Sequence, residues 1–127
     1  MFIDKTQKQN ITIRPLEEGF MVYGLSKSFW GWKVTDTLLI PPPGTDSFKV
    51  TEKTFHYSPK KDVHVIFIPT QLSRIDHIEA CRDNGEGIAF NSTVNEETKL
   101  YYYYSEQPKG KVEYKTFSKA GELIDKK

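Results

Sequence analysis

The sequence predicts a mainly β domain, a bent antiparallel sheet or small barrel formed by residues 1–127. Apolar residues recur with a period of two rather than about 3.6, which is the period of a strand. The apolar runs are short and rich in β-branched and aromatic residues. Clusters of Gly, Pro, Asn and Asp separate them at roughly eight to twelve residues, as in all-β domains. A chain of 127 residues has the length of one such domain.

The N-terminal third predicts a hairpin and a further strand. Ile11 and Ile13 alternate with polar residues, and the run 20–25 follows a glutamate–glycine break, so the two segments are expected to pair. A third strand is expected over residues 33–40. It ends at the Pro-Pro-Pro-Gly segment 41–44, because proline lacks the N–H that a strand ladder requires.

The middle of the chain contains the hairpin that the sequence defines best. Residues 48–57 and 62–69 flank a four-residue turn, 58–61, with a proline near its start. The side chains expected in the core from this pair are Phe55, Val65 and Phe67.

Two more segments predict a later hairpin. Residues 87–93 and 99–105 flank the turn 94–98, and a last strand is expected over 111–117. The run Tyr101 to Tyr104 alternates across the second of these strands, which predicts one tyrosine pair in the core and the other facing solvent.

Two segments leave helix and strand open. Residues 71–82 place apolar side chains three apart and precede an Asn-Gly stop, which suits a short helix, but a turn leading into a strand fits as well. Residues 118–127 suit either a terminal helix capped by Ser118 or a hairpin turned at Ala120 and Gly121.

The middle of the chain resembles the GRAM and bacterial pleckstrin-homology-like domains over about residues 48–105. The matching segments are Val50-Thr51 through Tyr57, Ile66-Phe67-Ile68-Pro69, Leu72-Ser73-Arg74-Ile75, Ile78-Glu79, 87–90 and 100–104. Thr70 and Gln71 are additional to the family pattern. The resemblance implies a strongly bent sheet or barrel that binds lipids or proteins. The family also closes one end of its barrel with a C-terminal helix, and in this respect the sequence departs from the family, because residues 118–127 support such a helix poorly.

Location is inferred from the apolar runs and from the single cysteine. The first ten residues carry charges and no apolar run of the kind that export requires, and the longest apolar stretch, 63–69, is far shorter than a membrane span. Cys81 has no partner for an internal disulfide, which favours a reducing compartment. We therefore expect a cytoplasmic protein without a transmembrane segment.

No catalytic signature or cofactor motif is visible, so a non-enzymatic binding or adaptor module without a cofactor or metal is the leading expectation. The alternative is a small metal- or cysteine-dependent enzyme that uses His56, His64, His77 and Cys81. In the predicted hairpin His56 and His64 lie nearly opposite each other, and a four-residue spacing puts His77 and Cys81 on one face of either a helix or a strand. For Cys81 the default expectation is a buried structural thiol.

Two groups of residues are candidates for binding. Trp30 and Trp32 stand on either side of a glycine, and a partly exposed pair of this kind would mark a partner surface, whereas a buried pair would be core. Four lysines around the middle hairpin could contact an anionic headgroup: Lys49, Lys53, Lys60 and Lys61. A formal charge of +1 argues against nucleic acid. A protein partner is therefore expected first, and an anionic lipid second.

Overall fold

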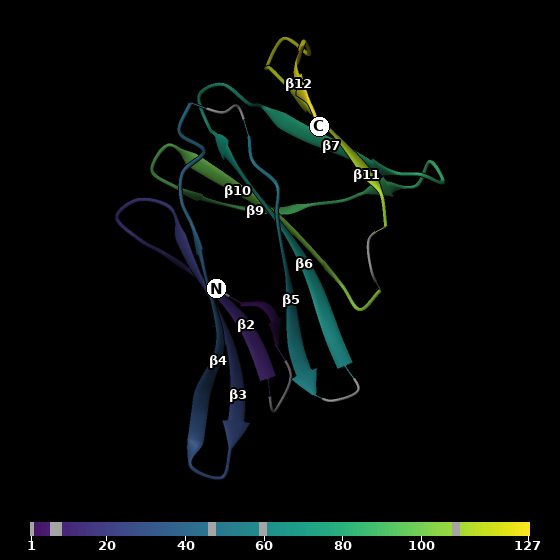
Figure 1. The fold of residues 1–127 in the computed structure, drawn as a ribbon. Helices are drawn as coiled ribbons and strands as arrows, with labels where there is room; N and C mark the ends of the chain where they lie inside the picture. Colours follow the sequence, from purple (N-terminus) through teal and green to yellow (C-terminus); the bar gives the residue numbers. More distant parts are fainter. Residues whose placement is uncertain (1, 6–8, 46–47, 59–60, 108–109) are drawn as a thin grey trace.

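The fold is that of a computed structural model, which describes residues 2–5, 9–45, 48–58, 61–107 and 110–127. These residues form three four-stranded antiparallel sheets, and the mainly β prediction is confirmed (Figure 1). Within the described ranges the sheets are open and do not close into a barrel. In the same ranges no helix is long and apolar enough to span a membrane.

The N-terminal sheet has the order β1-β2-β3-β4. Its strands are β1 (Phe2–Lys5), β2 (Gln9–Pro15), β3 (Phe20–Ser28) and β4 (Gly31–Ile40). The predicted hairpin is confirmed as β2–β3, and the third strand as β4, which begins at Gly31 rather than at residue 33 and ends at Ile40, directly before the prolines. Gly19 is required where the first turn closes, because its φ is +78° and a Cβ there would lie 2.3 Å from the Ile40 carbonyl oxygen.

The central sheet has the order β5-β6-β10-β9. Its strands are β5 (Thr51–Ser58), β6 (Lys61–Gln71), β9 (Asn91–Asn95) and β10 (Thr98–Ser105). The middle hairpin is confirmed as β5–β6, with Phe55, Val65 and Phe67 each at most 1% exposed. Two residues of its turn, 59 and 60, lie outside the described ranges.

The C-terminal sheet has the order β12-β11-β7-β8. Its strands are β7 (His77–Arg82), β8 (Gly87–Ile88), β11 (Val112–Phe117) and β12 (Leu123–Lys126). Both open alternatives are thereby decided: residues 71–82 form a turn and then a strand, and residues 118–127 form a hairpin turned at 119–120. The helical alternatives are wrong for both segments.

The central sheet is the middle of three layers. One apolar cluster joins it to the N-terminal sheet, with Ile11, Ile13, Phe20, Val22 and Ile40 facing Phe55, Val63, Val65, Phe67, Leu100 and Tyr102. A second cluster on its other face joins it to the C-terminal sheet through Phe48, Ile66, Ile68, Ala80, Tyr101 and Tyr114. Residues 65–68 of β6 are therefore covered on both sides, which explains why all four are apolar.

Two predictions need correction because of this layering. The expected single strand 87–93 is two strands: β8 pairs with β7 in the C-terminal sheet, and β9 pairs with β10 in the central sheet. The tyrosines do not divide by face. Tyr101 and Tyr102 are both 7% exposed, because both faces of β10 are covered there, and Tyr104 further along is 39% exposed.

Candidate functional site

The β3–β4 hairpin ends in a two-residue loop formed by Phe29 and Trp30, with Ser28 paired to Gly31 across it. The Trp30 N–H donates to Ser28 Oγ at 3.2 Å, and the same hydroxyl donates to the Gly31 carbonyl at 3.0 Å. Gly31 has φ +112°, a conformation that side chains disfavour. Ser28 and Gly31 thus hold the turn, and neither aromatic side chain is needed to form it.

The two loop aromatics are almost fully in solvent. Phe29 is 94% exposed and Trp30 is 91% exposed. Their rings meet edge to face, with centroids 5.3 Å apart and an interplanar angle of 87°. Two-residue hairpin loops favour Asn, Gly and Asp, so large aromatic residues at both positions depart from the usual turn chemistry.

The exposed apolar surface continues along the edge strand β4. Trp32 is 47% exposed and Val34 is 48% exposed, and residues two apart in a strand share a face. We call Phe29, Trp30 and Trp32 the aromatic tip. In Figure 1 the loop between β3 and β4 projects beyond the ends of the neighbouring strands.

The charged residues next to the aromatic tip in the sequence are cationic, and the next acidic residue along β4 is Asp36. Lys27 pairs with Trp32 in the β-ladder, and Lys33 pairs with Ser26; both lysines are exposed. They are the only charged residues between positions 19 and 35 of the sequence.

The lysines expected from the sequence lie elsewhere. Lys53 Nζ is 3.9 Å from the Asp36 carboxylate, which connects β5 to β4. Lys49 is exposed and precedes β5. Lys60 lies outside the described residues, and Lys61 begins β6 with a side chain that is likewise outside them. The structure therefore does not gather the four into one described site.

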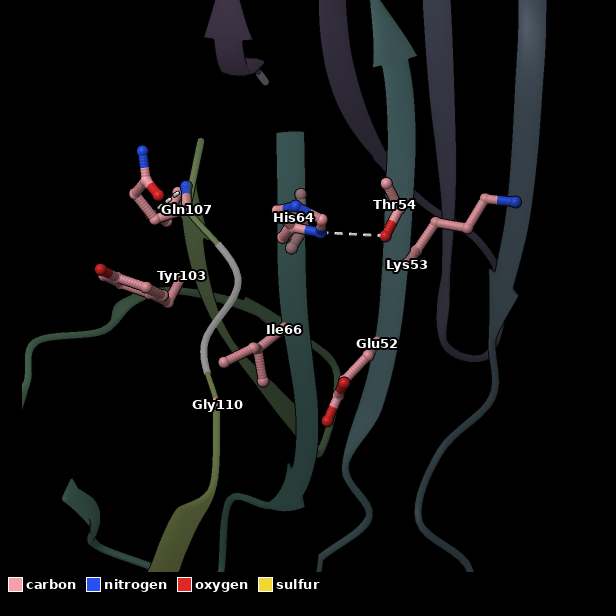
Figure 2. A pocket seen from close by; sticks show the side chains of 10 residues that line it. Glu52, Lys53, Thr54, His64, Ile66, Tyr103, Gln107 and Gly110 are labelled. Carbon is pink, nitrogen blue, oxygen red and sulfur yellow. Dashed lines mark hydrogen bonds between the residues drawn. The ribbon is translucent and has the colours of Figure 1, made fainter. Parts of the chain in front are cut away.

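A cavity of about 270 Å³ opens on the face of the central sheet beside the C-terminal sheet (Figure 2). Its wall is made by Glu52 and Thr54 of β5, His64 of β6, Tyr103 of β10, and Gln107 beyond β10. Thr54 Oγ1 and His64 Nδ1 are 3.0 Å apart and hydrogen-bonded. The cavity is lined by polar groups, but the Thr54–His64 hydrogen bond joins neighbouring residues of paired strands. This arrangement does not favour any particular ligand.

The apolar cluster between the central and C-terminal sheets contains a buried phenol. Tyr114 is 4% exposed, and its hydroxyl has no hydrogen-bond partner among the described residues. Burial, and secondarily the negative charge of Glu52, raises the pKa of Tyr114 to about 12. Burial, and secondarily Tyr104, also raises the pKa of Tyr102. Both phenols therefore stay neutral at physiological pH.

The residues of the enzymatic alternative are dispersed. His64 pairs with Thr54 rather than with His56, whose Nδ1 lies 2.7 Å from Asp62 instead. Among the described residues, no group of three or more His, Cys, Asp or Glu side chains is placed to hold a metal.

The His77–Cys81 pair is also separated. His77 stacks on Phe117 and its Nδ1 lies 3.1 Å from Asp76. Cys81 is four residues along β7, about 13 Å away at strand spacing, too far for the two side chains to form a nucleophile–base pair. Cys81 is exposed, so the expectation of a buried thiol is wrong.

The aromatic tip includes residues that sequence reasoning passed over. Trp30 lies in the loop and Trp32 in β4, so the two tryptophans do not belong to one straight strand. The missed members of the surface are Phe29, Lys27 and Lys33. A usable signal was present: Gly31 marks a turn, which leaves Phe29 and Trp30 as the loop residues.

No protein-family model, no curated protein and no solved structure matches this chain. The resemblance to GRAM and pleckstrin-homology-like domains accordingly stays a prediction from the sequence.

Proposed function

We propose that the protein is a binding module and that the aromatic tip is its recognition element. The observation that carries this proposal is the exposure of Phe29 and Trp30, at 94% and 91%. Contiguous exposed apolar surface is uncommon on a folded domain and marks interaction sites. Aromatic residues are also the side chains that contribute most at binding interfaces.

The folding of the hairpin does not account for these aromatics. The turn is held by Ser28 and Gly31, and the core of the N-terminal sheet lies at the other end of β3, at Phe20 and Val22. Residues that break the local turn preference without contributing to the core are expected where function maintains them. Contact with a partner would bury the tip and gain free energy in proportion to the apolar area removed from water.

The test is site-specific photo-crosslinking in the cells that produce the protein. A photoreactive phenylalanine derivative replaces Phe29 in one variant and Leu123, which is 54% exposed on β12, in a matched control. We expect covalent adducts of protein or lipid from position 29 and few from position 123. Equal adduct yields from the two positions, or none from position 29, would overturn the proposal.

A second variant checks that the tip is dispensable for folding. Phe29→Ser combined with Trp30→Ser is expected to keep the unfolding midpoint within experimental error, because both side chains are in solvent. A large loss of stability would mean that the aromatics serve the fold, and the proposal would fail.

A further inference from the structure

Two backbone groups at the aromatic tip are paired within the loop. Ser28 Oγ accepts the Trp30 N–H and donates to the Gly31 carbonyl, so one hydroxyl pairs two polar groups of the loop. Within a bilayer, each unpaired backbone group costs several kcal/mol. A loop with internal hydrogen bonds at its end can enter an apolar medium at lower cost than an open loop can.

The side chains at the tip are those that favour the membrane–water boundary. Tryptophan is enriched at headgroup depth, where its ring is apolar and its N–H meets water. Phenylalanine contributes the apolar area that anchors interfacial segments. Lys27 of β3 lies opposite Trp32 in the ladder, and Lys33 follows Trp32 in β4. Long cationic side chains at these positions can reach phosphate groups while the rings insert.

The charges along the N-terminal sheet point the tip toward an anionic surface. Glu17 and Glu18 lie in the turn at the other end of β3, about 30 Å from the tip at strand spacing. Asn95 ties this turn to the central sheet by donating to the Leu16 and Gly19 carbonyls, at 2.7 and 2.8 Å. The neighbouring β9–β10 turn carries Glu96 and Glu97 and lines the same hollow as Glu17 and Glu18.

One end of the molecule therefore carries four carboxylates beside the cation Arg14 of β2, and the other carries two lysines around three exposed aromatic rings. An anionic surface attracts the second end and repels the first.

We infer that the partner of the aromatic tip is an anionic lipid bilayer, which Phe29 and Trp30 enter while Lys27 and Lys33 contact its headgroups. This inference rests on the proposed function and names the chemistry of the partner. A projecting two-residue loop suits a bilayer because a fluid surface needs no preformed pocket to receive it. A protein partner is the other outcome of the test.

The unmodified protein carries its own probe, because its two tryptophans, Trp30 and Trp32, both belong to the tip. Vesicles of phosphatidylcholine alone are compared with vesicles of phosphatidylcholine and phosphatidylserine at about seven to three. With the anionic vesicles we expect a blue shift of tryptophan emission and protection from acrylamide quenching. Both effects should weaken as salt rises from about 50 to about 500 mM, because salt screens the lysines.

Variants that keep both tryptophans test the two parts of the contact. Lys27→Gln with Lys33→Gln is expected to weaken binding to anionic vesicles by about thirty-fold, since each lysine near such a surface contributes about 1 kcal/mol. Lys111→Gln with Lys119→Gln removes the same charge from exposed lysines of the C-terminal part and should change binding little. Phe29→Ser is expected to weaken binding by about ten-fold or more.

The outcomes separate the inference from the proposed function. If vesicles do not bind but position 29 crosslinks to polypeptide, the lipid inference is overturned and the binding function stands. If neither occurs, both fail. Binding without a change in tryptophan emission, equal binding to neutral and anionic vesicles, or equal losses from the two lysine pairs would each overturn the inference.

Discussion

Strands β6 and β4 both contain several apolar residues, yet those of β6 are buried and several of those in β4 are exposed. In β6, residues 65–70 are all buried, because the N-terminal sheet covers one face and the C-terminal sheet the other. In β4, residues 32–35 are all exposed, since the strand lies at the sheet edge and its end at the β3–β4 loop projects beyond the neighbouring strands (Figure 1). Apolar side chains therefore stabilise the fold in β6, whereas in β4 they are available to a partner.

The largest test of this contrast is one truncation in each region. Phe67→Ala should lower the free energy of unfolding by about 3–5 kcal/mol, because the ring is fully buried between layers. Trp30→Ala should change it by less than about 0.5 kcal/mol, as is usual for surface positions. Urea denaturation of both variants measures the difference. Comparable losses would show that the tip is part of the core.

A smaller loss of stability is expected at the β2–β3 turn, which lies at the other end of β3 from the aromatic tip. Gly19→Ala should cost about 3 kcal/mol, because it combines a left-handed backbone with a clash against the Ile40 carbonyl. Gly85→Ala is the matched control: its φ is +83° but a Cβ there meets nothing within 4 Å, so about 1–2 kcal/mol is expected. Equal losses in thermal melts would rule out close packing at position 19.

The connection between that turn and the central sheet is the next test. Asn95→Ala removes the two hydrogen bonds to the Leu16 and Gly19 carbonyls, and we expect a loss of about 1–2 kcal/mol. Asn91→Ala, at an exposed position of the same strand, should cost less than about 0.5 kcal/mol. Chemical denaturation compares the two. A neutral Asn95→Ala would mean that packing alone holds the two sheets together.

The smallest expected effect concerns the buried Tyr114 hydroxyl. Tyr114→Phe should raise stability by up to about 1 kcal/mol at neutral pH, because it removes a buried hydroxyl without a described partner. Tyr104→Phe, on an exposed position of β10, should change stability little.

The same phenol makes stability depend on alkaline pH. The pKa of Tyr114 is about 12 in the folded protein, above the ordinary value of 10.0, so the unfolded chain loses this proton first. Its contribution is fully present below pH 10 and declines as the pH rises toward 12. Denaturation between those values should show a shallower decline for Tyr114→Phe than for the unmodified protein. Identical slopes would contradict the burial of the hydroxyl.

Much of the strand pattern could be predicted because it depends on neighbours in sequence. The β2–β3 and β5–β6 hairpins follow from alternation and from turn residues, and the core positions Phe55, Val65 and Phe67 follow from the same alternation. Trp30 and Trp32 could be recognised as an unusual pair because they flank a glycine in the sequence. Local spacing could not say whether the rings were covered.

The remaining features depended on which sheet each strand joins. Apolar residues three positions apart in 71–82 suit a helix, but residues 77–82 form a strand because β7 pairs with β11. Hydrogen bonds between strands outweigh a weak local preference. The division of 87–93 between two sheets, and the burial of both Tyr101 and Tyr102, follow from the three-layer arrangement.

By itself, then, the sequence determined a β-rich chain of one domain's length, its main turns, and the position of two tryptophans beside a glycine. The tertiary structure alone decided that Phe29 and Trp30 project into water with Lys27 and Lys33 beside them, and that the histidines and Cys81 stay apart. The reason is physical: alternation records which side of a strand a residue occupies, whereas exposure depends on whether another sheet covers that side.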